Sequence, residues 1–219
     1  MPDLVTLASL KKQIKERTDQ TSSQFIGDSE LLTYINGSYR ELYDVLIQCT
    51  PDWNLAIADF TLTSDTLALP DNFYMLRGID NLSAGVQGGV PMKKFNFADR
   101  AAGGVFAYYG DWRTMQYRVI NNTILFSQGA GNTGNFSGIS VRLWYVPVPA
   151  DLVLDTDTID AVNNWSEYII VDVAMKIVTK EEQDASVYKF QKDQIKERIQ
   201  SLATERDFTS EKVSLTRRD

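Results

Sequence analysis

Two residue types that enzymes often use for nucleophilic and acid–base chemistry, histidine and cysteine, are absent or nearly absent from this chain. Its 219 residues include no histidine and one cysteine, Cys49. The lack of histidine excludes Ser-His-Asp and Cys-His catalysis, zinc sites built on imidazole, and histidine proton shuttles. Cys49 closes an apolar helical stretch, where a thiol is usually a small buried hydrophobe rather than a nucleophile. A single cysteine also excludes an internal disulfide.

A glycine-rich segment is the nearest match to a cofactor motif. Gly129–Gly134 reads GAGNTG and follows a strand-like run, as in the G-x-G-x-x-G pattern of dinucleotide-binding proteins. The next residues, Asn135–Gly138, lead into another strand, whereas a phosphate site needs a helix there. We therefore interpret the segment as a flexible loop between strands, well placed to meet a neighbouring subunit. Its candidate contact residues are Gly129, Gly131, Asn132, Gly134, Asn135 and Phe136.

Carboxylates and aromatic side chains leave one enzymatic alternative open. Four aspartates fall within residues 151–160 without the spacing of a calcium loop, so this stretch is predicted to be a solvated linker. An acid–base pair could still be assembled from distant carboxylates, as in glycosidases. An aromatic cluster would then stack on sugars, whereas in a structural protein it would pack in the core or at an interface. The cluster consists of Phe106, Tyr108, Tyr109 and Trp112.

Four stretches with apolar residues at spacings of three and four predict amphipathic helices. They are Leu4–Arg17, Asp28–Cys49, Trp165–Lys180 and Ser186–Glu205. Asp28 is expected to cap the second helix. The stretch Glu181–Ala185 is short enough to join the last two helices into an antiparallel hairpin. The apolar stripe of the last helix is expected at Tyr188, Ile195, Ile199 and Leu202.

The middle of the chain changes to the two-residue period of strands. Strands are predicted at Asp59–Thr63, Phe73–Leu82, Met115–Ile120, Thr123–Ser127 and Ile139–Val146, with a short helix at Asn96–Ala102. A hairpin is expected at Asn121-Asn122, because asparagine tolerates positive φ. Short strands joined by tight turns favour an antiparallel sheet or a small barrel.

These elements together predict an α+β protein. Residues 1–55 and 160–206 are expected to form one helical bundle from the N- and C-terminal helices. Residues 56–150 form an inserted β-rich region, a small antiparallel sheet or barrel, and residues 207–219 form an extended C-terminal arm.

The overall charge limits the partners. The net charge is −7, whereas a protein that gains its affinity from phosphate contacts carries a basic patch. Dedicated nucleic-acid binding is therefore not expected, although an acidic surface lets DNA pass without adsorbing. No apolar run approaches the length of a membrane span, and Met1–Leu10 lacks a signal-peptide pattern, so neither a membrane partner nor export is expected.

The C-terminal segment Asp207–Asp219 reads DFTSEKVSLTRRD and has no apolar stripe. Its three cations, Lys212, Arg217 and Arg218, have no acidic residue between them. Such a segment cannot bury enough surface to order itself. It is therefore either a frayed end or an arm that folds on a partner.

Three segments of the chain carry a family pattern. They are Asp28–Leu46 (DSELLTYINGSYRELYDVL), Leu67–Asp80 (LALPDNFYMLRGID) and Trp165–Ile199 (WSEYIIVDVAMKIVTKEEQDASVYKFQKDQIKERI), followed by the closing KVSLTRRD. In this order they resemble the head-to-tail adaptor (connector) proteins of tailed bacteriophages. The likeness covers most of the chain and is weakest over residues 83–138. Its motifs belong to a scaffold and include no catalytic signature.

The resemblance implies a structural protein of the virion neck, assembled in the host cytoplasm, with no catalytic residue, cofactor or metal. It implies a ring, typically of twelve copies, between the portal protein and the tail, through which genomic DNA passes without specific binding. Loops of the β-rich region would meet a tail nozzle, tail-tube or completion protein. The portal-binding arm would comprise Thr209, Ser210, Glu211, Lys212, Val213, Ser214, Leu215, Thr216, Arg217, Arg218 and Asp219.

Two other functions remain open from the sequence. One is a virion-associated glycan hydrolase that uses paired carboxylates and the aromatic cluster. The other is a tail-completion or stopper protein, which would not contact the portal protein directly.

Overall fold

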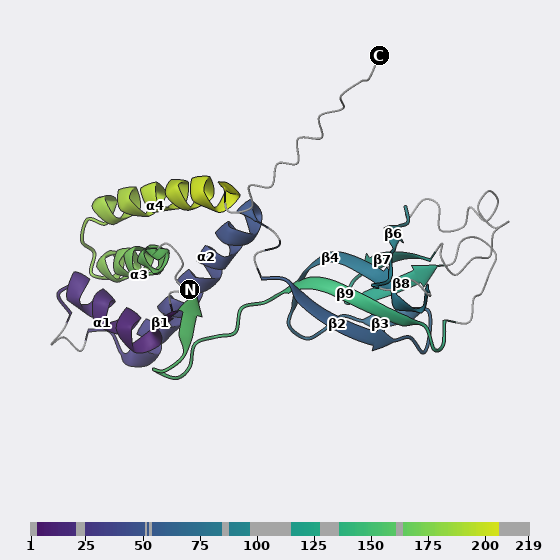
Figure 1. Cartoon of the computed structure of the whole chain (residues 1–219). Coiled ribbons are helices and arrows are strands. Elements are labelled where there is room, and N and C mark those ends of the chain that lie inside the picture. The colour runs from purple at the N-terminus through teal and green to yellow at the C-terminus, as the bar shows by residue number, and fades with distance from the viewer. Residues whose placement is uncertain are drawn as a thin grey trace, which may run out of the picture. The chain divides into compact units, whose positions relative to one another are not determined.

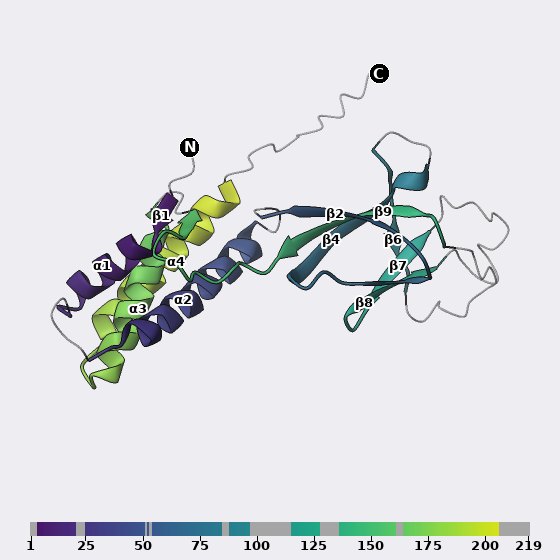
Figure 2. The same cartoon turned by 90° about the horizontal axis from the view of Figure 1, so that it is seen from below.

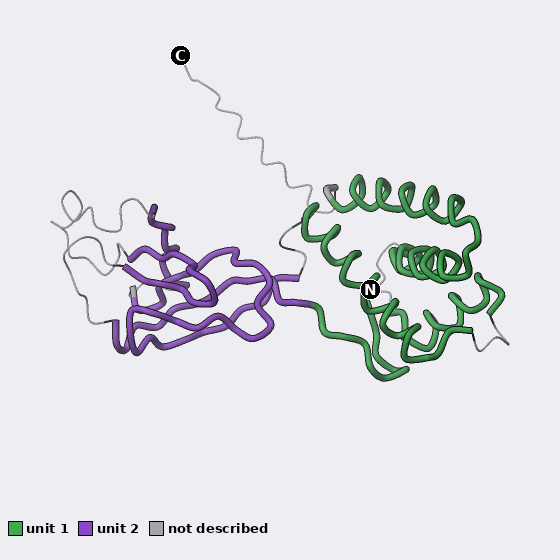
Figure 3. The backbone as a smooth tube through the Cα atoms, turned by 180° about the vertical axis from the view of Figure 1, so that it is seen from behind, with its two compact units in different colours: residues 1–50, 149–219 green, residues 51–148 purple. Residues whose placement is uncertain are grey.

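The chain divides into two compact units. The computed structural model describes residues 4–20, 25–50, 52, 54–84, 88–96, 115–127, 136–160 and 164–205. Unit 1 comprises Met1–Thr50 and Pro149–Asp219, and unit 2 comprises Pro51–Val148 (Figure 3). Among the described residues, helices dominate unit 1 and strands dominate unit 2 (Figure 1). The α+β class predicted from the sequence is confirmed.

In its described part, unit 1 is a bundle of four helices with a two-stranded sheet beside it. The helices are α1 (Leu7–Arg17), α2 (Asp28–Cys49), α3 (Ser166–Lys180) and α4 (Ser186–Glu205). The α3 helix lies between α1 and α2 (Figure 2), and it also packs against α4. The most apolar of the four is therefore at the centre, with Ile169, Val171 and Val173 completely buried. Among the described residues, no helix has the length and apolar composition that a bilayer crossing requires.

The predicted helix Leu4–Arg17 begins too early, because α1 starts at Leu7. Leu4–Thr6 forms strand β1, which pairs antiparallel with β10 (Thr158–Asp160). Thr6 then caps α1, since its side chain accepts a hydrogen bond from Ser9 N at 3.2 Å. Strand pairing and a capping threonine thus override the helical spacing of Leu4.

The expected role of Asp28 is also wrong. Gly27 occupies the N-cap position of α2, and no side chain caps this end. Asp28 is the first helical residue, and its carboxylate pairs with Lys15 Nζ at 3.0 Å. It still benefits the helix, because a negative charge in the first turn faces the positive end of the dipole.

The aspartate-rich stretch 151–160 is not a solvated linker. Leu152 and Ile159 are buried in unit 1, with 4% and 1% of their surfaces exposed. The Asn36 side-chain amide donates a hydrogen bond to Leu152 O at 3.0 Å and accepts one from Leu152 N at 2.9 Å. The prediction overlooked the apolar residues between the aspartates, which give the stretch enough buried surface to dock.

The residues of unit 2 that the structure describes form two four-stranded sheets. The first has the order β2-β9-β4-β5 and the second the order β3-β8-β7-β6, and every pair is antiparallel except β6 with β7. A short 3-10 helix, η1 (Leu82–Ala84), follows β4. The strands are β2 (Ala56–Thr61), β3 (Thr66–Ala68), β4 (Phe73–Asn81), β5 (Val90–Pro91), β6 (Lys93–Lys94), β7 (Gln116–Ile120), β8 (Thr123–Ser127) and β9 (Ser140–Pro147).

The two sheets share one hydrophobic core, which alternating inward-facing residues supply. Its buried members are Leu62, Ile79, Met115, Tyr117, Ile124, Phe126, Phe136, Val141, Leu143 and Tyr145. The predicted β7–β8 hairpin is confirmed, and Asn121 has the positive φ of 52° that its turn requires. Residues 97–102 of the predicted short helix lie outside the described part of the chain.

Candidate functional site: an ionic clamp on helix α4

A buried carboxylate occupies the middle of the helical unit. Asp172 on α3 has none of its surface exposed. One of its oxygens, Oδ1, accepts a bond from Lys192 Nζ at 2.6 Å. The other, Oδ2, accepts from Ser38 Oγ at 2.5 Å and contacts Lys176 Nζ at 2.6 Å. Both oxygens are therefore fully engaged by groups from α2, α3 and α4.

Glu41 on α2 completes this cluster. It accepts bonds from Lys176 Nζ at 3.1 Å and from Lys192 Nζ at 2.9 Å. Lys192 thus bridges a carboxylate of α2 and a carboxylate of α3. The five residues Ser38, Glu41, Asp172, Lys176 and Lys192 are called the ionic clamp below. Its two carboxylates balance two ammonium groups, which is the condition under which charges can be buried.

Asp172 and Lys192 keep their charges at neutral pH. Burial raises the pKa of Asp172, but the hydrogen bonds from Lys176, Lys192 and Ser38 outweigh burial and hold the pKa below its ordinary value. Burial lowers the pKa of Lys192, yet its hydrogen bonds to Asp172 and Glu41 raise the pKa above the usual lysine range. A carboxylate in this state holds no proton to give, so the cluster suits a fixed structural role better than general acid catalysis.

The clamp attaches α4 to the bundle, and the described part of this helix buries few apolar side chains. On α4, Ile199 and Ala203 are buried, whereas Leu202 is 39% exposed. The apolar stripe predicted for α4 is therefore wrong at Leu202, and Ala203 is the buried residue instead. The small side chain of Ala203 permits a close approach, since Thr50 Oγ1 donates to Ala203 O at 2.7 Å.

Further polar contacts hold the first turns of α4. Arg17 at the end of α1 pairs with Glu167 and donates to Gln191 Oε1 at 3.0 Å. The hydroxyl of Tyr188 donates to Arg17 O at 3.2 Å. The start of α4 is thus fixed to α1, and its middle is fixed to α2 and α3.

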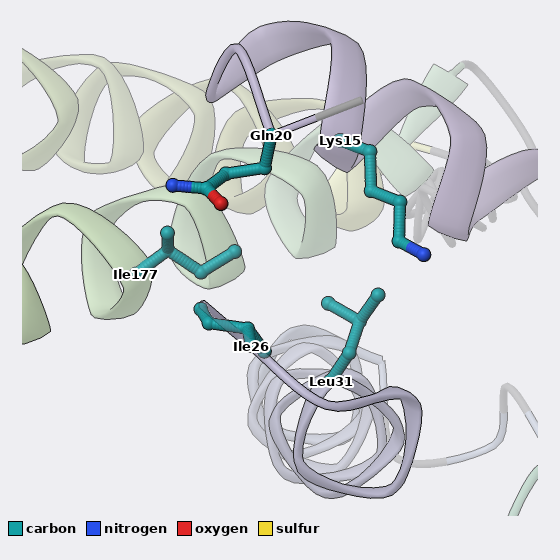
Figure 4. Close-up of a pocket in the computed structure, with 5 residues that line it drawn as sticks. All are labelled: Lys15, Gln20, Ile26, Leu31 and Ile177. Atoms are coloured by element: carbon teal, nitrogen blue, oxygen red, sulfur yellow. The ribbon is translucent and has the colours of Figure 1, made fainter. Parts of the chain in front are cut away.

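A small pocket opens near the same end of unit 1. It lies between α1, α2 and α3 and is lined by Lys15, Gln20, Ile26, Leu31 and Ile177 (Figure 4). Its volume of about 10 Å³ admits roughly one water molecule. A substrate or cofactor would not fit there. Within the described ranges, no three Cys, Asp or Glu side chains gather closely enough to hold a metal ion.

Most sequence-predicted contact residues lie outside the described part of the chain. This applies to the arm Thr209–Asp219, to Gly129–Asn135 of the glycine-rich loop, and to the aromatic cluster of residues 106–112. Phe136 is the exception. It is 7% exposed and packs in the core of unit 2, so its side chain anchors the end of the loop rather than offering a free contact.

Sequence reasoning missed the ionic clamp. The signal was a lone acid inside an apolar helix, in the run IIVDVAMK of α3. An acid at such a position needs a partner, and Lys176 four residues later is one. The contributions of Ser38, Glu41 and Lys192 depend on helix packing, which the sequence alone does not reveal.

The comparison with protein families identifies the chain. The family model for the SU10 adaptor protein matches residues 5–218. The chain belongs to the SU10 adaptor protein family. None of the curated proteins matches it.

Family membership assigns this adaptor a structural role in a bacteriophage virion. The match spans both units, so the helical bundle and the β unit both fall within the family pattern. The ionic clamp fits a structural role, because it links α2, α3 and α4 and each of its charged groups is paired with an oppositely charged one. The head-to-tail adaptor family named from the sequence is thereby confirmed.

Proposed function

We propose that the adaptor joins the portal protein to the tail in the virion neck. In this proposal it forms a ring, typically of twelve copies, around the channel through which the genome leaves the capsid. The net charge of −7 supports such a channel protein, because like charge keeps DNA from adsorbing.

The single observation that carries the proposal is that the helix before the C-terminal segment is attached to the bundle. The last helix, α4, ends at Glu205, four residues before the proposed portal-binding arm Thr209–Asp219. The ionic clamp and the Thr50–Ala203 bond attach this helix to the bundle. An arm that leaves a rigid base loses less entropy when it binds, because only its own residues must be ordered.

In this proposal the second binding region of the adaptor is the β unit. The glycine-rich loop Gly129–Asn135 runs between β8 and β9, and Phe136 anchors its end in the core. We propose that this loop meets the tail partner, a nozzle, tail-tube or completion protein. A loop on a packed β scaffold is a common place for such contacts.

Deleting Thr209–Asp219 from the full chain tests the arm. We expect the melting temperature to stay within about 2 °C, because the sequence of the arm has no apolar stripe with which to bury surface. Binding to purified portal rings should be lost. A matched control keeps the length and composition of the arm but scrambles its order. Equal portal affinity with and without the arm would overturn the portal assignment and favour a tail-completion or stopper protein.

A further inference from the structure

Strand β2 is the outer strand of the first sheet of unit 2. It pairs with β9, and β9 pairs with β4 on its other side (Figure 1). Within the described part of the chain, β2 therefore has a single strand neighbour. An outer strand leaves the N–H and C=O groups of every second residue without a partner strand, and these groups can pair with a strand of another chain.

The hydrogen bonds after β2 show which of its backbone groups point outward. Leu62 N donates to Ile139 O at 2.8 Å, and Leu62 O accepts from Gly138 N at 2.9 Å, so the backbone of this residue faces the β9 side. The direction alternates along an extended strand, and the even-numbered residues of β2 therefore face β9 as well. The outward N–H and C=O groups belong to Ile57, Asp59 and Thr61.

A bond on the far side of β9 supports the same assignment. Ser140 is the β9 partner of Thr61, and its N–H donates to Ser83 Oγ at 2.8 Å. Ser83 lies in η1, directly after β4, so this N–H points toward β4 and away from β2. Opposite residues of an antiparallel pair either bond each other or both point away. The backbone groups of Thr61 therefore point away from β9.

The other outer strands of unit 2 carry features that prevent pairing. Strand β5 contains Pro91, which has no N–H, and β6 consists of the exposed Lys93 and Lys94. Strand β3 has three residues and is followed closely by Pro70. Proline, lysine and short length are the usual protections of a sheet edge. Strand β2 has six residues and neither proline nor lysine, so it is the edge left open to a partner.

The side chains of β2 indicate what an added strand must carry. Those that pack against the core of unit 2 are half-buried, and they are Ala56, Ala58 and Phe60. The small alanines leave room for apolar side chains of a neighbouring strand. On the other face Ile57 is 53% exposed, and the Asp59 carboxylate accepts bonds from Arg142 at 2.7 and 2.8 Å. A strand with apolar side chains at alternate positions therefore fits this edge.

A second copy of the chain does not supply a matching strand. In the described part of the chain, every other outer strand has only two or three residues, against six in β2. Two β2 strands could pair about a two-fold axis, but such a contact closes at two copies and cannot continue around a ring. The strand that fits must come from a different protein.

From these observations we infer that a tail-side protein of the virion donates an extended segment, which pairs with β2 as a further strand of the sheet. The inference rests on the proposed function and names how the β unit holds its tail partner. Main-chain hydrogen bonds to Ile57, Asp59 and Thr61 supply affinity, and the space beside the two alanines selects the side chains of the segment.

Removing one outward N–H tests the pairing. The variant Ile57→Pro keeps the bonds to β9, because proline is tolerated on an edge strand where its nitrogen faces solvent. The full chain is bound to portal rings and mixed with tails isolated from virions, and cosedimentation measures binding. We expect Ile57→Pro to weaken binding at least about tenfold.

Two control variants separate the backbone from the side chain. Ile57→Ala removes the exposed side chain but keeps the N–H, and it should bind tails within about threefold of the original chain. Ala58→Pro removes an N–H that faces β9, so it should lower the melting temperature of the β unit, whereas Ile57→Pro should not.

Hydrogen exchange of the unchanged sequence covers the case in which proline disturbs folding. In the free chain the amides of Ile57, Asp59 and Thr61 should exchange faster than those of Ala58 and Phe60, which bond to β9. Binding of tails should slow the three outward amides at least about tenfold, because each amide that bonds the added strand is protected.

The outcomes distinguish this inference from the proposed function. Tail binding that Ile57→Pro leaves unchanged, or outward amides that exchange equally fast in the complex, would overturn the strand pairing and keep the joining role. Loss of self-association in Ile57→Pro, with tail binding intact, would identify a second copy as the occupant and also overturn the inference. An original chain that binds no tails would refute the proposed function and the inference together.

Discussion

Lys192 on α4 donates to Asp172 on α3 over 2.6 Å, and the same ammonium group binds Glu41 on α2 at 2.9 Å. One side chain therefore ties together three of the four helices of unit 1. It also lies 5.3 Å from the centre of the Tyr168 ring, which adds a cation–π contact. Together with the buried side chains of Ile199 and Ala203, this lysine holds α4 on the bundle.

Removing the central carboxylate should destabilise the bundle strongly. The change Asp172→Asn leaves Glu41 as the remaining carboxylate that faces Lys176 and Lys192. Removing one partner of a buried ion pair lowers the free energy of unfolding by roughly 3 kcal/mol. Chemical denaturation monitored by circular dichroism measures the loss. The added change Lys192→Met should recover part of it. Asp193→Asn, on the exposed side of α4, is the matched control and should leave stability unchanged.

The clamp also predicts how stability depends on acid. The pKa of Asp172 is lower in the folded chain than its ordinary value of 3.8, so its contribution is complete above that value and is lost as the pH falls through the folded pKa. Thermal melting between pH 7 and pH 3 should therefore show a steeper decline for the original chain than for Asp172→Asn. Parallel curves for the two proteins would contradict this account of the clamp.

A charge on the buried side of α2 should prevent folding. Leu42 is 2% exposed, and Leu42→Asp would place an unpaired carboxylate in the bundle at a cost of at least about 4 kcal/mol. We expect an insoluble or non-cooperatively melting protein. Thr33→Asp is the control, because Thr33 is exposed on the same helix. A soluble Leu42→Asp variant with a cooperative transition would show that this side of α2 is not part of the core.

The Asn36 amide should control the order of the 151–157 loop. Asn36→Ala removes both side-chain bonds to the Leu152 backbone, and a buried backbone group left unpaired costs about 1–3 kcal/mol. Hydrogen exchange at Val153 and Leu154 should become faster while α3 stays protected. Arg40→Ala, which removes an exposed ion pair of the same loop, should have a much smaller effect. Equal exchange rates in the two variants would contradict the role of Asn36.

The sequence predicts local elements of this fold better than their contacts. The helices starting at Ser166 and Ser186 and the hairpin at Asn121 follow from spacing and turn chemistry. Leu4 has helical spacing but pairs as a strand with Asp160, because the partner strand lies far along the chain. Non-local pairing of this kind leaves no local pattern.

The candidate site shows the same limit. Asp172 is visible in the sequence as a misplaced acid, yet Lys192 is twenty residues away and looks like any surface lysine. The aspartates of the 151–160 stretch look solvated, because the cations that bind them, Lys11 and Arg40, lie more than a hundred residues earlier. Apolar spacing identifies which side of a helix is buried, but ion pairs between helices appear only once the helices are packed.

The insertion of unit 2 between Thr50 and Pro149 has a mechanical consequence. The chain leaves the helical unit after Thr50 and returns to it at Pro149, so both terminal segments belong to the helical unit. A pulling force applied at the end of α4 is transmitted to α2 and α3 through Lys192 and the Thr50–Ala203 bond. Tension at the C-terminal end therefore loads the ionic clamp and the Thr50–Ala203 bond before it reaches the strands of unit 2.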